Sequence, residues 1–316
     1  MIEVLLATYN GATYLREQID SVLAQQDVEL RILAHDDGSR DATVSILREY
    51  AAAHPTRFYL LEDGHSTGSA KNNFAHLLAA STAPYVAFCD QDDVWLPNKL
   101  RDSLQAMQQL EAAHGSAKPL LVYTDLRVVD EHLQQISASL WSSNGLSSAA
   151  HPTFAIELAQ NAVTGCTVLL NHALAQRMLP IPNEAQMHDH WAALIALSSG
   201  ATAALPQPTV FYRQHSHNVV GAVQDNRSAT GKLQRLFGKE GAQARATQYT
   251  SDRAQASALL QHHASSMTPE TQRTAQAFLA LADASRFKRF SLVVQYGLWR
   301  DGLQRKAAAV ADMLLH

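Results

Sequence analysis

The chain has 316 residues, of which 47% are hydrophobic and 17% charged, a balance typical of a folded globular protein rather than a disordered one. Its length is enough for one large α/β domain and a smaller second part. Residues 1–225 hold 12 Lys and Arg against 23 Asp and Glu, whereas residues 226–316 hold 13 against 6. The acidic first part argues against a nucleic-acid partner, and the basic last part is typical of a segment that meets an anionic surface.

The sequence predicts neither a leader peptide nor a membrane span. Its first residues, MIEVLLATYN, lack the basic region and the cleavage site of a secretory signal. Its apolar runs are shorter than the roughly 20 residues that a spanning helix needs. The two cysteines, Cys89 and Cys166, lack metal-ligand spacing and are interpreted as reduced thiols. We therefore expect a cytoplasmic protein whose contact with the inner face of the membrane, if any, is peripheral.

Strands and helices are predicted to alternate through the first ninety residues. The strands are expected at residues 2–7, 30–34, 58–61 and 85–89, and the helices at residues 14–25, 41–50 and 68–80. This alternation predicts parallel strands joined by right-handed helical crossovers. Polar clusters at residues 8–10, 36–37 and 90–93 follow strand ends. Because ligands bind at the carboxyl ends of such strands, we expect these clusters to lie together.

The second half of the chain is expected to complete the sheet and then to become helical. Further strands are predicted at residues 120–124, 167–170 and 210–213, and a helix at residues 188–197. Residues 137–153 are rich in Ser, Ala and Gly and are predicted to form a mobile loop. From about residue 225 the pattern is helical and rich in Ala, Gln and Arg. We therefore predict a catalytic domain over residues 1–225 and a helical region over residues 226–316.

The sequence Asp90-Gln91-Asp92-Asp93 places three carboxylates at the end of an apolar strand. Carboxylates this close repel one another and raise each other's pKa unless a cation compensates them. Mg²⁺ and Mn²⁺ bind carboxylate oxygens and often bridge them to phosphates. The pattern therefore indicates either a metal–diphosphate site or a solvated acidic turn.

Six segments, taken in order, resemble the family-two inverting glycosyltransferases with the GT-A fold, and most closely the bacterial rhamnosyltransferase-like branch. They are ATYNG, HDDGSRD, GSAKNNF, FCDQDDVWLPNKL, MHDHW and FYRQHSHNVVG, within roughly residues 1–220. The resemblance implies an α/β fold with a Rossmann-like mixed sheet flanked by helices, and with a helical C-terminal extension. It also implies transfer of a sugar with inversion from a nucleotide-diphosphate donor, with Mg²⁺ or Mn²⁺ as cofactor.

The resemblance assigns five residues to the nucleotide. Thr8, Tyr9 and Asn10 match the loop that holds the base and ribose, and a tyrosine there can stack on a base. Asp37 matches the acceptor for the pyrimidine ring N–H, and Lys71 is expected to meet the base or a phosphate. The alternatives are a plain turn for the first three, a helix cap for Asp37 and a solvated helix start for Lys71.

The resemblance also assigns the donor sugar and the metal. Asp92 is expected to be a direct metal ligand, and Asp90 to contact the ribose or the donor sugar. Asp93 is expected to orient its neighbours or to bind the sugar. His215 matches a histidine that related enzymes present to the metal, with His217 as the alternative, and either histidine could instead lie in a polar surface loop.

Asp189 matches the general base that deprotonates the acceptor hydroxyl. The alternative is a first-turn acid favoured by the helix dipole. Trp191 is expected to form a platform for the acceptor. His188 and His190 are not expected to form a zinc pair, because residues two apart face different sides of a helix. Arg213 is interpreted either as a counter-charge to the diphosphate or as a brace for its loop.

These assignments predict a glycosyltransferase of surface polysaccharide synthesis, such as that of lipopolysaccharide, with dTDP-rhamnose as the first choice of donor and UDP-hexoses as the second. The acceptor is expected to be a saccharide or a lipid-linked sugar. The alternative is an inactive nucleotide-sugar-binding homologue that acts in a complex. A hydrolase or nucleotidyltransferase is disfavoured, because ATYNG lacks basic residues.

The basic and apolar stretch from residue 286 to residue 306 has two interpretations. One is an amphipathic segment that attaches to an anionic membrane. The other is a helical hairpin that packs on the catalytic domain or on a second subunit, which keeps a homodimer among the options.

Overall fold

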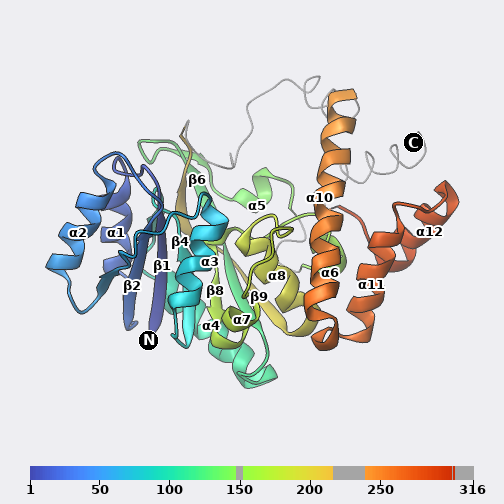
Figure 1. Ribbon diagram of the computed structural model, residues 1–316, viewed down its shortest axis with the longest axis horizontal. Coiled ribbons are helices and arrows are strands. Elements are labelled where there is room, and N and C mark those ends of the chain that lie inside the picture. The colour runs from blue at the N-terminus through green and yellow to red at the C-terminus, as the bar shows by residue number, and fades with distance from the viewer. Residues whose placement is uncertain (147–151, 216–238, 301, 303–316) are drawn as a thin grey trace.

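A computed structural model describes residues 1–146, 152–215, 239–300 and 302. Within these residues, helices flank a nine-stranded sheet of order β3-β2-β1-β4-β8-β6-β9-β5, with β7 beside β6 (Figure 1). The strands are β1 (Ile2–Thr8), β2 (Leu30–Asp36), β3 (Phe58–Leu60), β4 (Tyr85–Cys89), β5 (Val94–Trp95), β6 (Leu120–Val129), β7 (Gln135–Ser137), β8 (Leu169–Asn171) and β9 (Ala201–Arg213).

The described helices fall into a sheet-flanking set and a C-terminal set. The first set is α1 (Leu15–Leu23), α2 (Thr43–Ala53), α3 (Ala70–Ala80), α4 (Lys99–His114), α5 (Leu140–Ser143), α6 (Phe154–Glu157), α7 (His172–Arg177) and α8 (His188–Ser199), with a 3-10 turn at Gly165–Thr167. The second set is α10 (Lys239–His263), α11 (Pro269–Ala280) and α12 (Arg286–Tyr296), with a 3-10 turn at Ala264–Ser266. Figure 1 shows the second set at the opposite end of the molecule from α1 and α2.

The sheet is parallel in its first half and mixed in its second. β1 pairs in parallel with β2 and β4, and β2 pairs in parallel with β3. β8 then runs antiparallel to both β4 and β6, whereas β6 and β9 are parallel. All seven residues of β1 are buried, as expected of a central parallel strand covered on both faces. The predicted parallel arrangement therefore holds for the half of the sheet from β3 to β4, and the mixed sheet expected for the whole fold is confirmed.

Two hydrophobic clusters cover the two faces of this sheet. Along β1, Leu5 joins one cluster while Val4 and Leu6 join the other, because successive side chains of a strand point to opposite faces. The cluster with Leu5 also contains Trp191 of α8 and buried residues of all three C-terminal helices, including Ala256, Leu259, Phe278 and Val293. The C-terminal helices therefore pack on the sheet-containing part through α8 and its neighbours. The predicted boundary near residue 225 lies outside the described residues.

One local prediction needs correction. The expected mobile loop at residues 137–153 contains the ordered helix α5, whose residues Leu140 and Trp141 are buried. Residues 147–151 of that loop lie outside the described part of the chain. Among the described residues, no helix is both long and apolar enough to cross a bilayer.

Candidate active site

A cleft of about 810 Å³ opens at the carboxyl ends of β1, β2 and β4. The starts of α3 and α8 and the turn at Gly165–Thr167 complete its walls. Its polar lining includes Thr8, Tyr9, Asp37, Asn73, Asp90, Asp92, Asn161, His188 and Asp189. The polar clusters that the sequence placed at strand ends therefore meet in one cavity.

Asp36 holds the first turn of the nucleotide side together. Its carboxylate accepts hydrogen bonds from Thr8 Oγ1 at 2.9 Å, from the backbone N–H of Gly38 at 3.1 Å and from that of Ser39 at 2.7 Å. These contacts fix the end of β1 against the end of β2. Asp36 is thus a structural residue, and it leaves its neighbour Asp37 to face the cleft.

Asp37 is buried and joins two loops beside the cleft. Its Oδ1 accepts hydrogen bonds from Ser66 Oγ at 3.2 Å, from the backbone N–H of Gly68 at 3.2 Å and from that of Thr67. Its own N–H donates to the carbonyl of Thr8 at 2.9 Å. A carboxylate with an oxygen fixed by three donors has a defined direction, which a base N–H can exploit.

Tyr9 and Asn10 have different roles in the structure. The side chain of Tyr9 is 55% exposed at the cleft rim, and Gln91 holds its backbone through two bonds, Tyr9 N–H to Oε1 at 2.8 Å and Nε2 to Tyr9 O at 3.0 Å. Asn10 has a positive φ of 49°, and its Oδ1 accepts from the N–H of Arg40 at 2.8 Å. Asn10 does not line the cleft, so it shapes the turn and the predicted direct contact with nucleotide is not supported.

The prediction for Lys71 also needs correction. Its ammonium donates to the carbonyls of Asn183 at 2.9 Å and Ala185 at 2.6 Å, and it does not line the main cleft. Partial burial lowers the pKa of Lys71. These carbonyls belong to irregular chain before α8, so the lysine supplies hydrogen bonds that a helix would otherwise provide. Lys71 therefore links the start of α3 to this segment.

Asp90 and Asp92 bring negative charge to the floor of the cleft. Burial, followed by the charges of Asp92 and Asp189, raises the pKa of Asp90 to about 7. One oxygen of Asp92 lies 2.9 Å from Nε2 of His215, which the chain brings back from the end of β9. The Asp92–His215 pair predicted for the metal is thus assembled, and its oxygen and nitrogen donors suit Mg²⁺ or Mn²⁺. His217 lies outside the described residues.

Asp93 is fully buried and does not line the cleft, so the predicted donor contact is not supported. Its Oδ1 accepts the N–H of Arg213 at 3.1 Å, which fits the alternative role of orienting its neighbours. Asp90, Asp93 and Cys166 each offer a ligand atom within 4.8 Å of the others. Burial, then the charges of Asp92 and Asp90, raises the pKa of Asp93 well above its usual range.

Arg213 braces the loop rather than facing the cleft. Its Nε donates to the carbonyl of Asp92 at 2.8 Å, and its guanidinium lies 4.4 Å from the ring centroid of Tyr14. It also pairs with Glu17 and is only 2% exposed. This packing fixes the end of β9 and hence the position of His215.

Asp189 sits in the first turn of α8 and faces the cleft. Its Oδ1 accepts from the backbone N–H of His190 at 2.6 Å and from Nδ2 of Asn161 at 3.4 Å. Burial raises the pKa of Asp189 to about 6, although these bonds and one from Gly165 oppose the rise. A Cβ on Gly165 would lie 3.0 Å from Nε2 of His188 and 3.6 Å from Oδ2 of Asp189, so glycine keeps this floor open.

Trp191 contradicts its predicted role as an acceptor platform. Its side chain is 0% exposed, and its indole N–H donates to the carbonyl of Met178 at 3.3 Å. Nearly every residue of α8 is buried. Asp189 faces the cleft, and Trp191, two residues further along the helix, faces the hydrophobic core. Trp191 therefore anchors the helix that carries Asp189.

The two histidines beside Asp189 point to different places, as predicted. His188 packs on Phe74 and Phe88 with ring centroids 4.1 Å and 4.6 Å away, and burial lowers its pKa to about 3. His190 instead contacts the carbonyl of Glu157 through Nε2 at 2.7 Å, and its Nδ1 lies 3.0 Å from Nε2 of Gln255 in α10. His190 thus links the catalytic helix to the C-terminal helices.

Four contributors were not foreseen from the sequence: Gln91, Asn161, Gly165 and His188, all of which line the cleft. Gln91 could have been identified from the sequence, because it lies within the acidic segment Asp90–Asp93. Gly11 faces it, and a Cβ there would lie 2.1 Å from Gln91 Oε1. Asn161 and Gly165 lie in irregular chain, where periodicity carries no information.

The chain is similar in sequence to known glycosyltransferases. Residues 3–131 match the sequence profile described as Glycosyl transferase family 2. The chain is 28% identical over 242 residues to "dTDP-rhamnosyl transferase RfbG" of Shigella flexneri, covering 73% of this chain and 78% of that protein. It is 27% identical over 182 residues to an uncharacterized glycosyltransferase of Rickettsia prowazekii, covering 56% of this chain and 52% of the relative. The chain thus spans about half the length of the second relative.

Two solved structures share the fold. S. aureus TarS 1–349 in complex with UDP superposes with a TM-score of 0.57 at 15% identity, over 92% of this chain and 74% of that one. The mannosyltransferase PcManGT from Pyrobaculum calidifontis, in complex with GDP-Man and Mn²⁺, gives a TM-score of 0.52 at 17% identity, over 99% and 87%. The mixed sheet with flanking and C-terminal helices is therefore a GT-A fold.

Proposed function

We propose that this chain is a family-two glycosyltransferase, and specifically a metal-dependent inverting rhamnosyltransferase that uses dTDP-rhamnose. Its residues 3–131 match the profile of glycosyl transferase family 2, and the chain is 28% identical to a dTDP-rhamnosyl transferase of Shigella flexneri. The acceptor would be a saccharide or a lipid-linked sugar of a surface polysaccharide. The choice of rhamnose is supported by the Shigella flexneri relative, and UDP-hexoses are the second choice of donor.

One observation carries the catalytic proposal: Asp189 and the Asp90–Asp92 pair line the same cleft from different elements. An inverting transfer needs a base on one face of the sugar and a stabilised leaving group on the other. Asp189, with its pKa near 6, is ionised at neutral pH yet basic enough to accept a proton. It would remove the proton of the acceptor hydroxyl as that oxygen attacks the anomeric carbon.

The donor would lie along the other wall. Asp37 would accept the N–H of the pyrimidine ring, and the exposed ring of Tyr9 at the rim would stack on the base. Asp92 and His215 would hold Mg²⁺ or Mn²⁺, which supplies positive charge to the departing diphosphate. The Mn²⁺ in the complex of the mannosyltransferase with the same fold supports this assignment.

A donor screen by thermal shift tests the proposal directly. The unmodified chain is incubated with dTDP-rhamnose, UDP-sugars and GDP-mannose, each with and without Mn²⁺. We expect Mn²⁺-dependent stabilisation by dTDP-rhamnose, about 2.7 kcal/mol at a hundredfold excess over Kd. Asp92→Asn should lose the Mn²⁺-dependent part, whereas Asp283→Asn, which changes an exposed carboxylate of the C-terminal region, should keep it.

Product analysis then separates the remaining outcomes. Transfer that gives the inverted anomer supports the mechanism, and stabilisation by a UDP-sugar alone would replace rhamnose as the donor. Donor binding without transfer to any acceptor or water would favour an inactive nucleotide-sugar-binding homologue.

We also propose that α12 makes peripheral contact with an anionic membrane from the cytoplasmic side. Phe287, Phe290 and Val294 are 91%, 52% and 55% exposed at positions that share one helix face. Arg286 and Lys288 add positive charge beside them. Co-sedimentation with vesicles that contain anionic lipid should fall with added salt and with Phe287→Ser/Phe290→Ser. If this face of α12 instead formed a dimer interface, the chain would be dimeric in the absence of lipid.

A further inference from the structure

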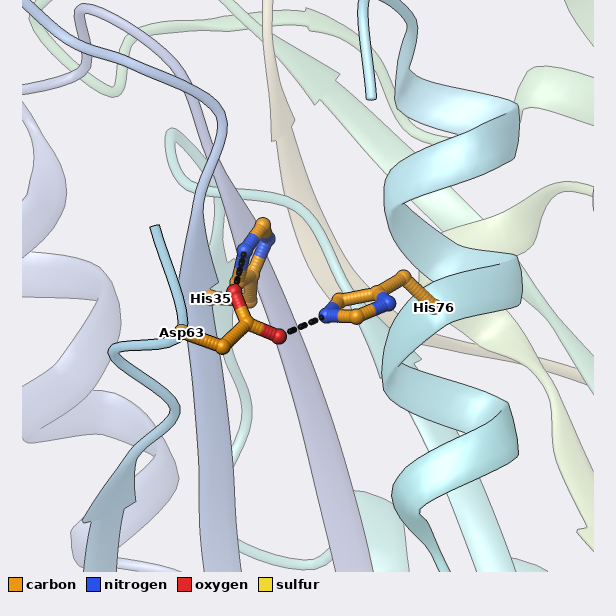
Figure 2. Close-up of side chains that lie close together, drawn as sticks. All are labelled: His35, Asp63 and His76. Carbon is orange, nitrogen blue, oxygen red and sulfur yellow. Dashed lines mark hydrogen bonds and ion pairs between the residues drawn. The ribbon is translucent and has the colours of Figure 1, made fainter. Parts of the chain in front are cut away.

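A second group of potential ligands lies behind the nucleotide wall of the cleft. His35 is the penultimate residue of β2, Asp63 follows β3, and His76 lies in α3. Figure 2 shows their side chains turned toward one another. Nε2 of His76 lies 2.7 Å from one oxygen of Asp63, and Nε2 of His35 lies 3.6 Å from the other. One ligand atom from each residue lies within 4.8 Å of the other two.

The tautomer of His35 follows from its neighbour Asn73. The amide Nδ2 of Asn73 faces two carbonyls, those of Thr8 at 3.5 Å and His35 at 3.4 Å, so it is the donor end. Its Oδ1 therefore faces Nδ1 of His35, at 2.7 Å. An amide oxygen can only accept, so Nδ1 carries the proton and Nε2 of a neutral His35 presents a lone pair toward Asp63.

A lone pair directed at a carboxylate needs a positive charge between them. A second proton on His35 would supply it, and so would a bound cation. The second histidine favours the cation, since His76 approaches the same carboxylate from a different element. Fixing the tautomer of a ligating histidine through a hydrogen bond from its other nitrogen is also what metal sites commonly do.

We propose that His35, Asp63 and His76 bind a transition-metal ion of the zinc class. Two imidazole nitrogens and one carboxylate are ligands that zinc accepts, and tetrahedral bonds of about 2.0–2.1 Å hold neighbouring ligand atoms about 3.3 Å apart. The distances of 2.7 Å and 3.6 Å bracket that value. Asp63 and His76 are 36% and 27% exposed on their side chains, so an ion and a water ligand can enter.

The site would fix a loop that the cleft depends on. Asp63 begins the segment that carries Ser66, Thr67 and Gly68, and all three of these donate to Asp37. A metal ion bridging β2, this segment and α3 would hold those donors in place. We therefore assign the ion a structural role, separate from the Asp92–His215 pair in the cleft.

His65 offers a fourth ligand. The ring of His65 stacks on that of His76 with centroids 5.1 Å apart. The backbone N–H of His65 donates to the carboxylate of Asp63 at 3.0 Å. The residue is exposed, so its ring can turn toward the ion without disturbing the core. His65→Ala is expected to weaken metal binding without abolishing it.

Zinc titration of the full-length chain without a histidine tag tests the proposal. After removal of metal, Zn²⁺ should bind with one ion per chain and raise the melting temperature, and Co²⁺ should give the visible absorption of a tetrahedral site. His76→Gln and Asp63→Asn, two changes at partly exposed positions, should each lose the melting shift and the spectrum. His132→Gln, an exposed histidine that likewise stands near a carboxylate, should keep both.

Further results decide whether the ion lies at these three residues. Asp92→Asn should retain zinc binding, because the cleft pair uses other residues. Absence of zinc binding in the folded chain would overturn the proposal and leave a protonated His35 as the partner of Asp63. Zinc binding that survives in both His76→Gln and Asp63→Asn would overturn it as well, and thiolate absorption in the Co²⁺ spectrum would relocate the ion to Cys166.

Discussion

The two walls of the cleft treat their carboxylates in opposite ways. On the wall proposed to hold the nucleotide, Asp36 and Asp37 are surrounded by N–H and O–H donors from neighbouring turns. On the wall proposed to carry the reaction, burial raises the pKa of Asp90 to about 7 and that of Asp189 to about 6. The first wall is satisfied before any ligand arrives, whereas the second holds negative charge that the fold does not fully compensate.

This difference indicates how the work of binding and reaction is divided. A satisfied wall presents fixed acceptors to a base, at little cost in reorganisation. An uncompensated wall gains most from a cation and from an incoming proton, which are what a metal–diphosphate and an acceptor hydroxyl provide. The buried carboxylates therefore lower the free energy of unfolding relative to neutral side chains at the same positions. Such a loss is common where activity needs a strained site.

The largest expected effect comes from Asp189→Asn. Loss of the base should lower kcat by about 10²- to 10⁴-fold. Because burial raises the pKa of Asp189 from 3.8 to about 6, stability falls as pH rises between these two values and the loss persists above them. The Asp189→Asn change should therefore raise stability at pH 7 by up to about 3 kcal/mol. Steady-state kinetics and urea unfolding measure both. A variant that is inactive but less stable would contradict the assignment of strain to this residue.

The pH profile should follow the same carboxylate. Because a base must be ionised, kcat should fall about tenfold per pH unit below the pKa of Asp189 near 6 and level off above it. Saturating Mn²⁺ and donor keep Asp90 from adding its own titration. If the acid limb persists unchanged in the residual activity of Asp189→Asn, the limb belongs to another group.

A smaller effect is expected on the satisfied wall. Asp37→Ala removes the acceptor for three donors and should cost about 1–3 kcal/mol of unfolding free energy. Asp37→Asn keeps one oxygen for those donors, so it should cost less stability. Calorimetry should show weaker nucleotide binding for both. Equal stability losses in the two variants would mean that the charge of Asp37 matters more than its geometry.

The smallest effect should come from Lys71→Met. The ammonium bonds only loop carbonyls, so its loss should cost about 0.5–1.5 kcal/mol of stability. Donor affinity, measured by the same calorimetry, should stay within about twofold, far less than the tenfold that 1.4 kcal/mol represents. A tenfold loss would restore the phosphate contact predicted from the sequence.

Sequence patterns located the parallel half of the sheet well, because each of its strands is mostly apolar and is followed by a turn signal. β4 (Tyr85–Cys89) matches the expected residues 85–89, and β1 differs by one residue. Helix α4 (Lys99–His114) was not predicted, since it follows the acidic segment without a clear start signal. Only the last four residues of the long β9, 210–213, were expected to form a strand, because Pro206 and Pro208 interrupt its pattern.

The candidate site divides along the same line. Strand-end positions predicted that the acidic clusters would meet, and the family resemblance singled out Asp37, Asp90, Asp92 and Asp189, all of which line the cleft. Their roles stay predictions. Trp191 was misassigned, and of the two roles predicted for Asp93 the contact with Arg213 fits orientation of its neighbours rather than sugar binding. One residue of offset on a buried helix or turn decides between cleft and core. The direction of Lys71 depends on a loop more than a hundred residues away, which no local pattern encodes.

The bond between Gln255 and His190 has a practical consequence for dissecting this protein. It joins α10 to the first turn of α8, one residue from Asp189, and the C-terminal helices share that helix's hydrophobic cluster. A chain truncated before α10 would therefore lose more than membrane contact. It would also lose the packing of α10 against α8, the helix that carries Asp189. The proposed membrane attachment is better tested by changing surface side chains of α12, because these changes leave α8 packed against its neighbours.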